Sequence, residues 1–145
     1  MIFDDRTERN MATLHPQAQA MAREFMQAAV PIMRQRGVDV RIISGTRTYA
    51  EQDALYAKRP RVTKARGGYS NHNFGVAFDI GLFKGKTYLE ASPLYKECGG
   101  IGKSVGLEWG GDWKSFTDEP HFEIPTGLTM AQKRERVNAG KDLFA

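Results

Sequence analysis

The ten residues Ser70-Asn-His-Asn-Phe-Gly-Val-Ala-Phe-Asp79 say the most about the fold and the chemistry of this chain. Side chains alternate along a strand, so His72 and Asp79, seven positions apart, would face opposite ways on a straight strand. In a fully extended chain they would also lie about 23 Å apart. Gly75 tolerates a positive φ angle and offers the bend that brings them together. We therefore expect His72 on a loop that enters a strand and Asp79 inside that strand.

A second cluster, Asp118-Glu-Pro-His-Phe-Glu123, follows further along the chain. His121 and Glu123 are two positions apart, so on a strand they share one face, while Phe122 points the other way into the core. A carboxylate beside a metal-binding histidine commonly orients its ring, and we expect Glu123 to do this for His121.

The two clusters together offer the ligands of a catalytic zinc site. Such sites take three protein ligands and keep one position open, and His72, Asp79 and His121 supply two imidazoles and a carboxylate. A nearby carboxylate can then accept a proton from the attacking water. We expect Asp118 to be this base, with Glu119 as the competing candidate. The pattern is not the helical H-E-x-x-H signature of many metalloproteases.

The rest of the sequence predicts an α+β fold, because helices and strands mix without a regular βαβ repeat. Apolar spacing predicts helices and β-branched or alternating runs predict strands. A polar, basic loop is expected over residues 59–69. The expected helices cover residues 16–35, 49–58, 92–105 and 130–138, and the expected strands cover residues 38–44, 76–83, 107–109 and 121–124.

Length and composition indicate one globular domain over residues 1–145, with a net charge of +4. No run of apolar residues approaches the ~20 needed to span a bilayer, and the charged N-terminus does not resemble a secretion signal. Cys98 is the single cysteine, so no disulfide can form within the chain, and we expect a buried thiol. His15, which precedes Pro16 at a helix start, is expected to be structural.

The segment Ser70–Asp79 resembles the S-x-H-x-x-G-x-A-x-D motif of the zinc D-Ala-D-Ala peptidase family. That family includes vancomycin-resistance peptidases, phage endolysins and autolysins that cut the L-alanyl-D-glutamate bond of peptidoglycan. Ser44-Gly-Thr-Arg-Thr48 looks like the S-G-x-R-[ST] segment of the family, and Asp118-Glu-Pro-His121 looks like its [ED]-x-x-H segment. The three motifs occur in the family order between about residues 40 and 125.

This resemblance implies a fold of the Hedgehog and D-Ala-D-Ala peptidase type, in which a central antiparallel sheet flanked by helices carries the metal ligands. It implies one zinc ion per chain at His72, Asp79 and His121, with Asp118 as the catalytic base. It also implies that Arg47 contacts the substrate or the developing oxyanion, which suits a permanently charged guanidinium.

Three further side chains are expected near the site in supporting or substrate-binding roles. Ser70 and Gln52 match positions near the site of the family. Trp113 is expected either to line the cleft, together with Trp109 and Phe116, or to belong to an aromatic core.

The expected activity is that of a phage or prophage endolysin that cleaves L-alanyl-D-glutamate in the peptidoglycan stem peptide. Aspartate at the base position resembles the phage-type endopeptidases, whereas the vancomycin-resistance enzymes have glutamate there. Such an enzyme would stay in the host cytoplasm until release through a holin and would act on the wall from the periplasmic side. We expect a monomer that neither inserts into membranes nor binds nucleic acid.

Three alternatives remain open on the sequence. One is a D,D-carboxypeptidase or dipeptidase of the same family, which would need export. Another is a non-catalytic wall-binding module that uses the zinc only structurally. The third is a basic metal nuclease, suggested by Asn71, His72 and Asn73 near a basic loop.

Overall fold

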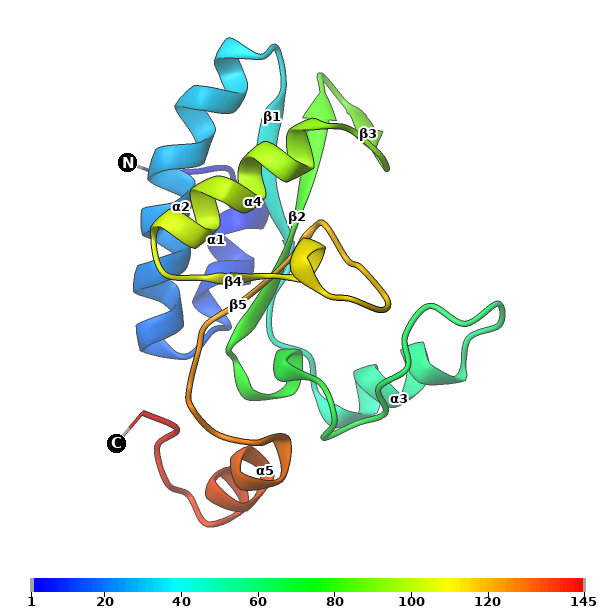
Figure 1. The fold of residues 1–145 in the computed structure, drawn as a ribbon. Coiled ribbons are helices and arrows are strands. Elements are labelled where there is room, and N and C mark those ends of the chain that lie inside the picture. Colours follow the sequence, from blue (N-terminus) through cyan, green and yellow to red (C-terminus); the bar gives the residue numbers. More distant parts are fainter. Residues whose placement is uncertain (1, 145) are drawn as a thin grey trace.

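The computed structural model of the chain describes residues 2–144. Five strands form one antiparallel sheet in the order β1-β2-β5-β4, with β3 also paired to β2 (Figure 1). This arrangement confirms the predicted α+β class with a central antiparallel sheet. The elements are α1 (Asp5–Ala12), α2 (Pro16–Gln35), β1 (Asp39–Ser44), α3 (Tyr49–Ala57), the 3-10 turn η1 (Asn71–Phe74), β2 (Ala77–Lys84), β3 (Thr87–Leu89), α4 (Leu94–Ser104), β4 (Glu108–Trp109), the 3-10 turn η2 (Gly110–Asp112), β5 (His121–Glu123) and α5 (Met130–Asn138).

The long helix α2 supplies one side of the core. His15 caps its start by accepting a hydrogen bond from the N–H of Gln17, which confirms a structural role for this histidine. Pro31 does not end the helix, because it lies on the exposed face and the pattern continues to Gln35. The buried stripe is Ala18, Ala22, Phe25, Met26, Ala29, Val30 and Met33.

Helix α1 was not predicted from the sequence, although its first turn carries a clear signal. Asp4 accepts a hydrogen bond from the N–H of Thr7 and so caps the helix. The hydroxyl of Thr7 is buried and accepts a hydrogen bond of 3.0 Å from the N–H of Ile42 in β1. Thr7 therefore ties α1 to the edge of the sheet, where it covers backbone that would otherwise be unpaired.

Helix α4 lies on the same side of the sheet as α2 (Figure 1) and packs closely because it contains glycines. A Cβ atom at Gly102 would lie 2.4 Å from Cε1 of Phe122, and one at Gly99 would lie 2.4 Å from Cδ2 of Trp109. Glycine weakens a helix by about 1 kcal/mol relative to alanine. At these two positions it is nevertheless needed, because only glycine leaves room for the side chains of β4 and β5. Cys98 is buried on the same helix, as predicted.

Three aromatic rings join α2 to the two strands that carry the motif residues. Phe25 lies 4.8 Å from Phe122 and 5.9 Å from Phe78, measured between ring centroids, and Phe78 stacks on Phe122 at 5.6 Å. All three side chains are fully buried. Phe78 precedes Asp79 on β2 and Phe122 follows His121 on β5, so the core fixes both strands from the face opposite His121 and Asp79.

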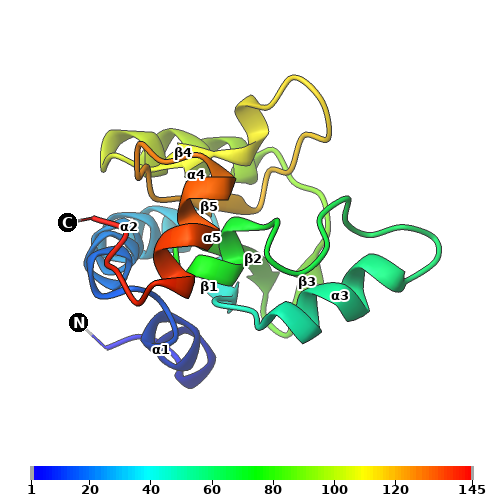
Figure 2. The same cartoon turned by 90° about the horizontal axis from the view of Figure 1, so that it is seen from below.

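Helix α5, near the C-terminus, packs next to the turn that carries His72. In Figure 2, which views the fold from below, α5 lies beside the turn η1, and the two elements are in contact. Among residues 2–144, no helix is both long and apolar enough to cross a membrane.

Candidate metal centre

Strand register places the second histidine beside the first carboxylate. In the antiparallel pair β2–β5, Asp79 lies opposite His121 and Ala77 lies opposite Glu123. Directly opposed residues have their side chains on the same face, with Cβ atoms about 5 Å apart. Residues that are 42 positions apart in the sequence are therefore brought together by backbone pairing alone.

His72 reaches the same place through a tight turn. It lies in η1, within the connection that leads into β2, so the loop expected before the strand is a short 3-10 turn. Ser70 caps the turn by accepting a hydrogen bond from the N–H of His72 at 3.2 Å, and Oδ1 of Asn73 accepts one from the N–H of Ser70 at 3.3 Å. Gly75 then reverses the chain at φ 72°, in the left-handed region that the bend requires.

The side chains of His72, Asp79 and His121 converge on one point, which we call the cleft floor. One potential ligand atom from each residue lies within 4.8 Å of the others. His72 Nε2 is 3.2 Å from Asp79 Oδ2, and His121 Nδ1 is 3.0 Å from Asp79 Oδ1. Two imidazole nitrogens and a carboxylate oxygen form a donor set that suits zinc.

The other ring nitrogen of each histidine has a partner of its own. His72 Nδ1 lies 2.8 Å from the carbonyl oxygen of Gly45, and His121 Nε2 lies 2.8 Å from Oε1 of Glu123. Because a carbonyl or carboxylate can only accept, these outer nitrogens donate to them. Nε2 of His72 and Nδ1 of His121 are then the ring nitrogens that face the floor. The structure thus places Glu123 where the sequence predicted it, beside His121.

Arg47 lies at the edge of the floor and is held there by three partners. Its Nη2 donates to Asp79 Oδ2 at 3.1 Å and to Ser44 Oγ at 3.3 Å, and its Nη1 donates to Gln52 Oε1 at 3.2 Å. Gln52 is completely buried and also donates from Nε2 to the carbonyl of Ala65 at 2.7 Å. The glutamine therefore links the arginine to the loop after α3.

A cleft of about 700 Å³ opens above the floor. Its rim consists of two segments, residues 62–65 and residues 113–117, which meet where Lys64 Nζ lies 3.3 Å from the ring centroid of Phe116. Trp113 lies within the second segment, and its ring is 4.9 Å from that of His121. The cleft is also lined by Arg47, Ser70, Asn71, Asp118, Glu123 and Met130.

Of the two candidates for the base, and of the two tryptophans, one member of each pair lines the cleft and the other does not. Asp118 lines the cleft together with the floor residues, whereas Glu119 is not among the lining residues. The backbone of Glu119 instead accepts a hydrogen bond from Nε1 of Trp109, whose ring is buried against α4. Trp109 thus belongs to the core and Trp113 to the cleft.

The charges of the site shift the pKa of each group in it. Burial alone would raise the pKa of the Asp79 carboxyl, but His72 and His121 hold it well below its usual range. Burial would lower the pKa of His121, yet its hydrogen bonds to Asp79 and Glu123 outweigh this and raise the pKa to about 9. The pKa of Asp118 is raised by burial and by the negative charge of Asp79. Perturbed carboxyl and imidazole groups in one cleft are typical of a catalytic site.

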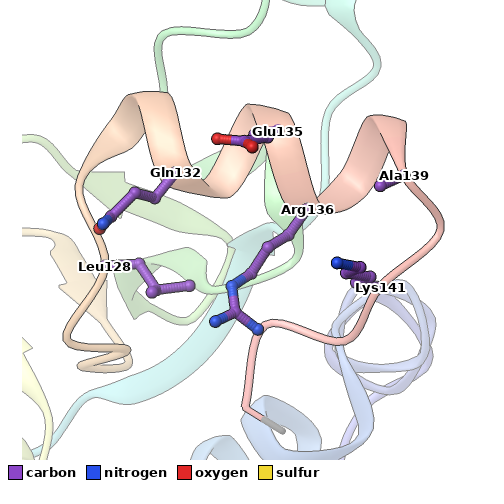
Figure 3. A pocket seen from close by; sticks show the side chains of 6 residues that line it. All are labelled: Leu128, Gln132, Glu135, Arg136, Ala139 and Lys141. Carbon is purple, nitrogen blue, oxygen red and sulfur yellow. The ribbon is translucent and has the colours of Figure 1, made fainter.

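A second hollow, of about 280 Å³, lies between α5 and the C-terminal segment (Figure 3). Arg136 extends across it toward Leu128, and Glu135 supplies the single carboxylate among its lining side chains. The lining contains no histidine or cysteine, so it offers no comparable set of metal ligands.

Sequence reasoning missed several residues that support the site. Gly110 is required because a Cβ atom there would lie 2.3 Å from the carbonyl oxygen of Asp118. Asn73 Nδ2 donates to the carbonyl of Arg47 at 3.0 Å, and its S-x-x-N spacing from Ser70 is a capping signal that could have been found. Lys133 lies buried in α5, and no local sequence pattern points to it.

The comparisons with known proteins agree with this geometry. A profile of the D-alanyl-D-alanine carboxypeptidase family matches residues 63–124. The chain is 39% identical, over 126 residues, to the peptidoglycan L-alanyl-D-glutamate endopeptidase CwlK of Bacillus subtilis, covering 77% of this chain and 73% of that protein. It is 31% identical over 125 residues to an L-alanyl-D-glutamate peptidase of a Listeria phage, covering 84% of this chain but 42% of the phage protein.

Solved structures of the same fold extend the comparison. The L-Ala D-Glu endopeptidase ChiX of Serratia marcescens superposes with a TM-score of 0.68 at 23% identity, covering 86% of this chain and 90% of that one. The vancomycin resistance D,D-pentapeptidase VanY in complex with Zn(II) gives 0.57 at 18% identity, covering 90% and 81%. On the strength of its similarity to CwlK, the chain belongs to the D-alanyl-D-alanine carboxypeptidase and L-alanyl-D-glutamate endopeptidase family of zinc metallopeptidases.

Proposed function

We propose that this protein is a zinc-dependent endopeptidase that cleaves the L-alanyl-D-glutamate bond of the peptidoglycan stem peptide. The observation that carries the proposal is the cleft floor, where His72, Asp79 and His121 converge below a cleft that Asp118 also lines. A structural zinc site would be closed by a fourth protein ligand, whereas three ligands facing a cleft leave a position for water or substrate.

The floor fits one zinc ion per chain. His72 would bind through Nε2 and His121 through Nδ1, because their other ring nitrogens are engaged with Gly45 and Glu123. Asp79 would contribute a carboxylate oxygen. A zinc ion held there supplies Lewis acidity, which polarises a peptide carbonyl and makes a water molecule easier to deprotonate.

Asp118 would move the proton during cleavage. Its carboxylate accepts the proton of the attacking water and then passes it to the amine nitrogen that leaves as the C–N bond breaks. Burial and the charge of Asp79 raise the pKa of Asp118, which brings this group closer to the pH at which it must both accept and release a proton.

Arg47, Trp113, Ser70 and Gln52 would prepare the cleft for the substrate. Arg47 presents a fixed positive charge at the edge of the floor and would stabilise substrate oxygens or the developing oxyanion. Trp113, whose ring lies 4.9 Å from that of His121, would offer an apolar wall to the substrate. Ser70 fixes the turn that carries His72, and Gln52 fixes Arg47.

The choice of bond rests on the relatives. The two curated proteins named above, from a bacterium and from a phage, are an L-alanyl-D-glutamate endopeptidase and peptidase. A D,D-carboxypeptidase is the second candidate, since the matching family profile bears that name and a neighbour, VanYB, was solved with D-alanine-D-alanine. Both reactions are hydrolyses of a peptide bond, so the catalytic groups alone do not distinguish them.

Mass analysis of purified peptidoglycan after digestion separates these candidates. The proposal predicts new fragments that begin at D-glutamate and glycan strands that retain L-alanine. Loss of a terminal D-alanine alone would favour the carboxypeptidase. Products that fail to appear, with or without a chelator, would favour a non-catalytic wall-binding module.

The base is tested by neighbouring variants. We expect Asp118→Ala to retain zinc but to lose at least about 10²-fold in cleavage, and Glu119→Ala, the matched control, to retain both zinc and cleavage. The reverse pattern would transfer the role to Glu119.

In its biological setting, we propose that the protein acts as a phage or prophage endolysin during host lysis. It would remain in the host cytoplasm until release and then act on the wall from the periplasmic side as a monomer. The phage relative supports this setting. We expect no plasmid nicking under conditions of full peptidase activity, and nicking that depends on the metal would favour the nuclease alternative.

A further inference from the structure

Lys133 is a buried lysine on the face of α5 that contacts the metal-bearing turn. Its side chain is 7% exposed, although lysine is rarely buried unless it is paired. Its Nζ donates a hydrogen bond of 2.5 Å to Oδ1 of Asn71, the first residue of η1 and the immediate neighbour of His72. A buried charge that contacts the turn beside a metal ligand requires an explanation beyond packing.

A chain of hydrogen bonds continues from Asn71 to the second histidine. Oδ1 of Asn71 accepts from Lys133, which leaves its amide N–H groups to donate, and Glu123 is the carboxylate within their reach. Glu123 in turn lies 2.8 Å from Nε2 of His121. The path Lys133–Asn71–Glu123–His121 therefore links α5 to both sides of the cleft floor, through the neighbour of His72 and through the partner of His121.

Neighbouring residues of α5 hold the same segment. Arg134 Nη1 donates to the carbonyl of Gly68 at 3.1 Å, and its guanidinium lies 4.1 Å from the ring centroid of Tyr69. Met130, at the start of the helix, lines the cleft. Helix α5 is thus docked along residues 68–71 by two hydrogen bonds and one cation–π contact. The helix lies outside residues 63–124, the part of the chain that the family profile matches.

We propose that Lys133 is a positioning residue for the metal centre, acting through Asn71 on Glu123 and so on the orientation of His121. Glu123 must keep its acceptor oxygen on Nε2 if the ring is to present Nδ1 to the floor. Asn71, fixed by its hydrogen bond from Lys133, is the further neighbour of that carboxylate. Partners of this outer kind typically alter metal affinity by 10-fold to 100-fold when they are removed.

The first test measures zinc affinity by competition with a chromophoric chelator in Lys133→Met. Methionine keeps an unbranched apolar stem of similar volume but removes the ammonium group and its hydrogen bond to Asn71. We expect the zinc Kd to rise by about 10-fold while the melting temperature of the zinc-free protein is unchanged or higher. Lys141→Met, an exposed lysine of the same C-terminal region, is the matched control and should leave both quantities unchanged.

The second test asks whether Lys133 acts through Asn71. We expect Asn71→Ala to raise the zinc Kd, and the further change Lys133→Met in that background to have no additional effect, because the path is already broken. Additive effects of the two substitutions would overturn the path. A zinc Kd for Lys133→Met within twofold of the parent, or a fall in the melting temperature of its zinc-free form, would overturn the positioning role.

The inference rests on the proposed zinc site and not on the bond that is cleaved. Failure of the parent protein to bind zinc would refute the proposed function. Normal zinc binding and cleavage by the parent, together with an unaffected Lys133→Met variant, would refute the role of Lys133 alone.

Discussion

The cleft floor and the cleft rim are built in different ways. The floor histidines are buried, with His72 3% and His121 7% exposed, and every floor side chain has at least two polar partners placed by strand register or by a capped turn. The rim consists of loops, in which Phe116 is 64% exposed and is contacted by the cation of Lys64. The difference suggests that the floor sets the chemistry and the rim controls access to it.

We expect the largest effect on zinc binding from a change of one ligand atom in the floor. Asp79→Asn keeps the shape of the side chain but replaces a carboxylate oxygen between the two histidines with an amide. We expect zinc affinity to fall by more than the ~100-fold typical of losing an outer partner, and cleavage to be lost with it. Metal content after dialysis and chelator competition measure the effect. Full zinc occupancy in this variant would remove Asp79 from the ligand set.

A packing change beneath the floor should act on stability. In Gly102→Ala, the new methyl group would lie 2.4 Å from Phe122, which neighbours His121 on β5. Overpacking of this kind costs about 1–3 kcal/mol of unfolding free energy, measured by urea denaturation. Gly100→Ala, with no atom within 4 Å of the added Cβ, is the control and should be neutral or stabilising by up to ~1 kcal/mol. Equal effects at both positions would contradict close packing of α4.

A change at the rim should affect substrate binding more than the fold. Phe116→Ala removes an exposed ring and its contact with Lys64, so we expect stability to change by no more than about 0.5 kcal/mol. Zinc affinity should stay the same, while KM for a soluble muropeptide changes and kcat does not. Loss of zinc in this variant would show that the rim supports the floor.

A surface pair far from both regions provides the smallest expected effect. Arg23, through its hydrogen bond, and the N–H of Phe3 lower the pKa of Glu8 below 4.5. A lowered folded-state pKa contributes stability above pH 4.5 that is lost as the pH falls through the folded value. Glu8→Gln should therefore lower stability at pH 7 by about 0.2–1 kcal/mol, and the difference from the parent should vanish in acid. A difference that persists when the pH lies well below the folded pKa of Glu8 would contradict this assignment.

The floor could be predicted from the sequence because each of its features has a local signal. The glycine at position 75 marked the bend, and the two-residue spacing of His121 and Glu123 marked a shared strand face. Helix α2 and the cap of α5 at Thr129 follow from apolar spacing and capping residues. These signals operate over a few residues, where sequence reasoning is strongest.

The parts that could not be predicted depend on contacts between distant segments. Strand β3 is three residues long and mostly exposed, so it lacks a hydrophobic pattern. Gly99 and Gly102 lower the helix propensity of α4, and only the rings of Trp109 and Phe122 explain why they are there. In the sequence, Lys133 is indistinguishable from the other basic residues of its helix. It is buried only because α5 docks on η1, which the local sequence does not indicate.

The most direct test of the account is a paired measurement on Asp118→Ala, with zinc content and muropeptide cleavage determined on the same preparation. We expect one zinc per chain, as in the parent, and cleavage reduced by about 10²-fold to 10⁴-fold, because the proton acceptor is lost while the ligands remain. Cleavage at the parental rate would contradict the assignment of Asp118 as the base. Loss of the zinc would instead place Asp118 among the ligands and contradict a floor made of His72, Asp79 and His121.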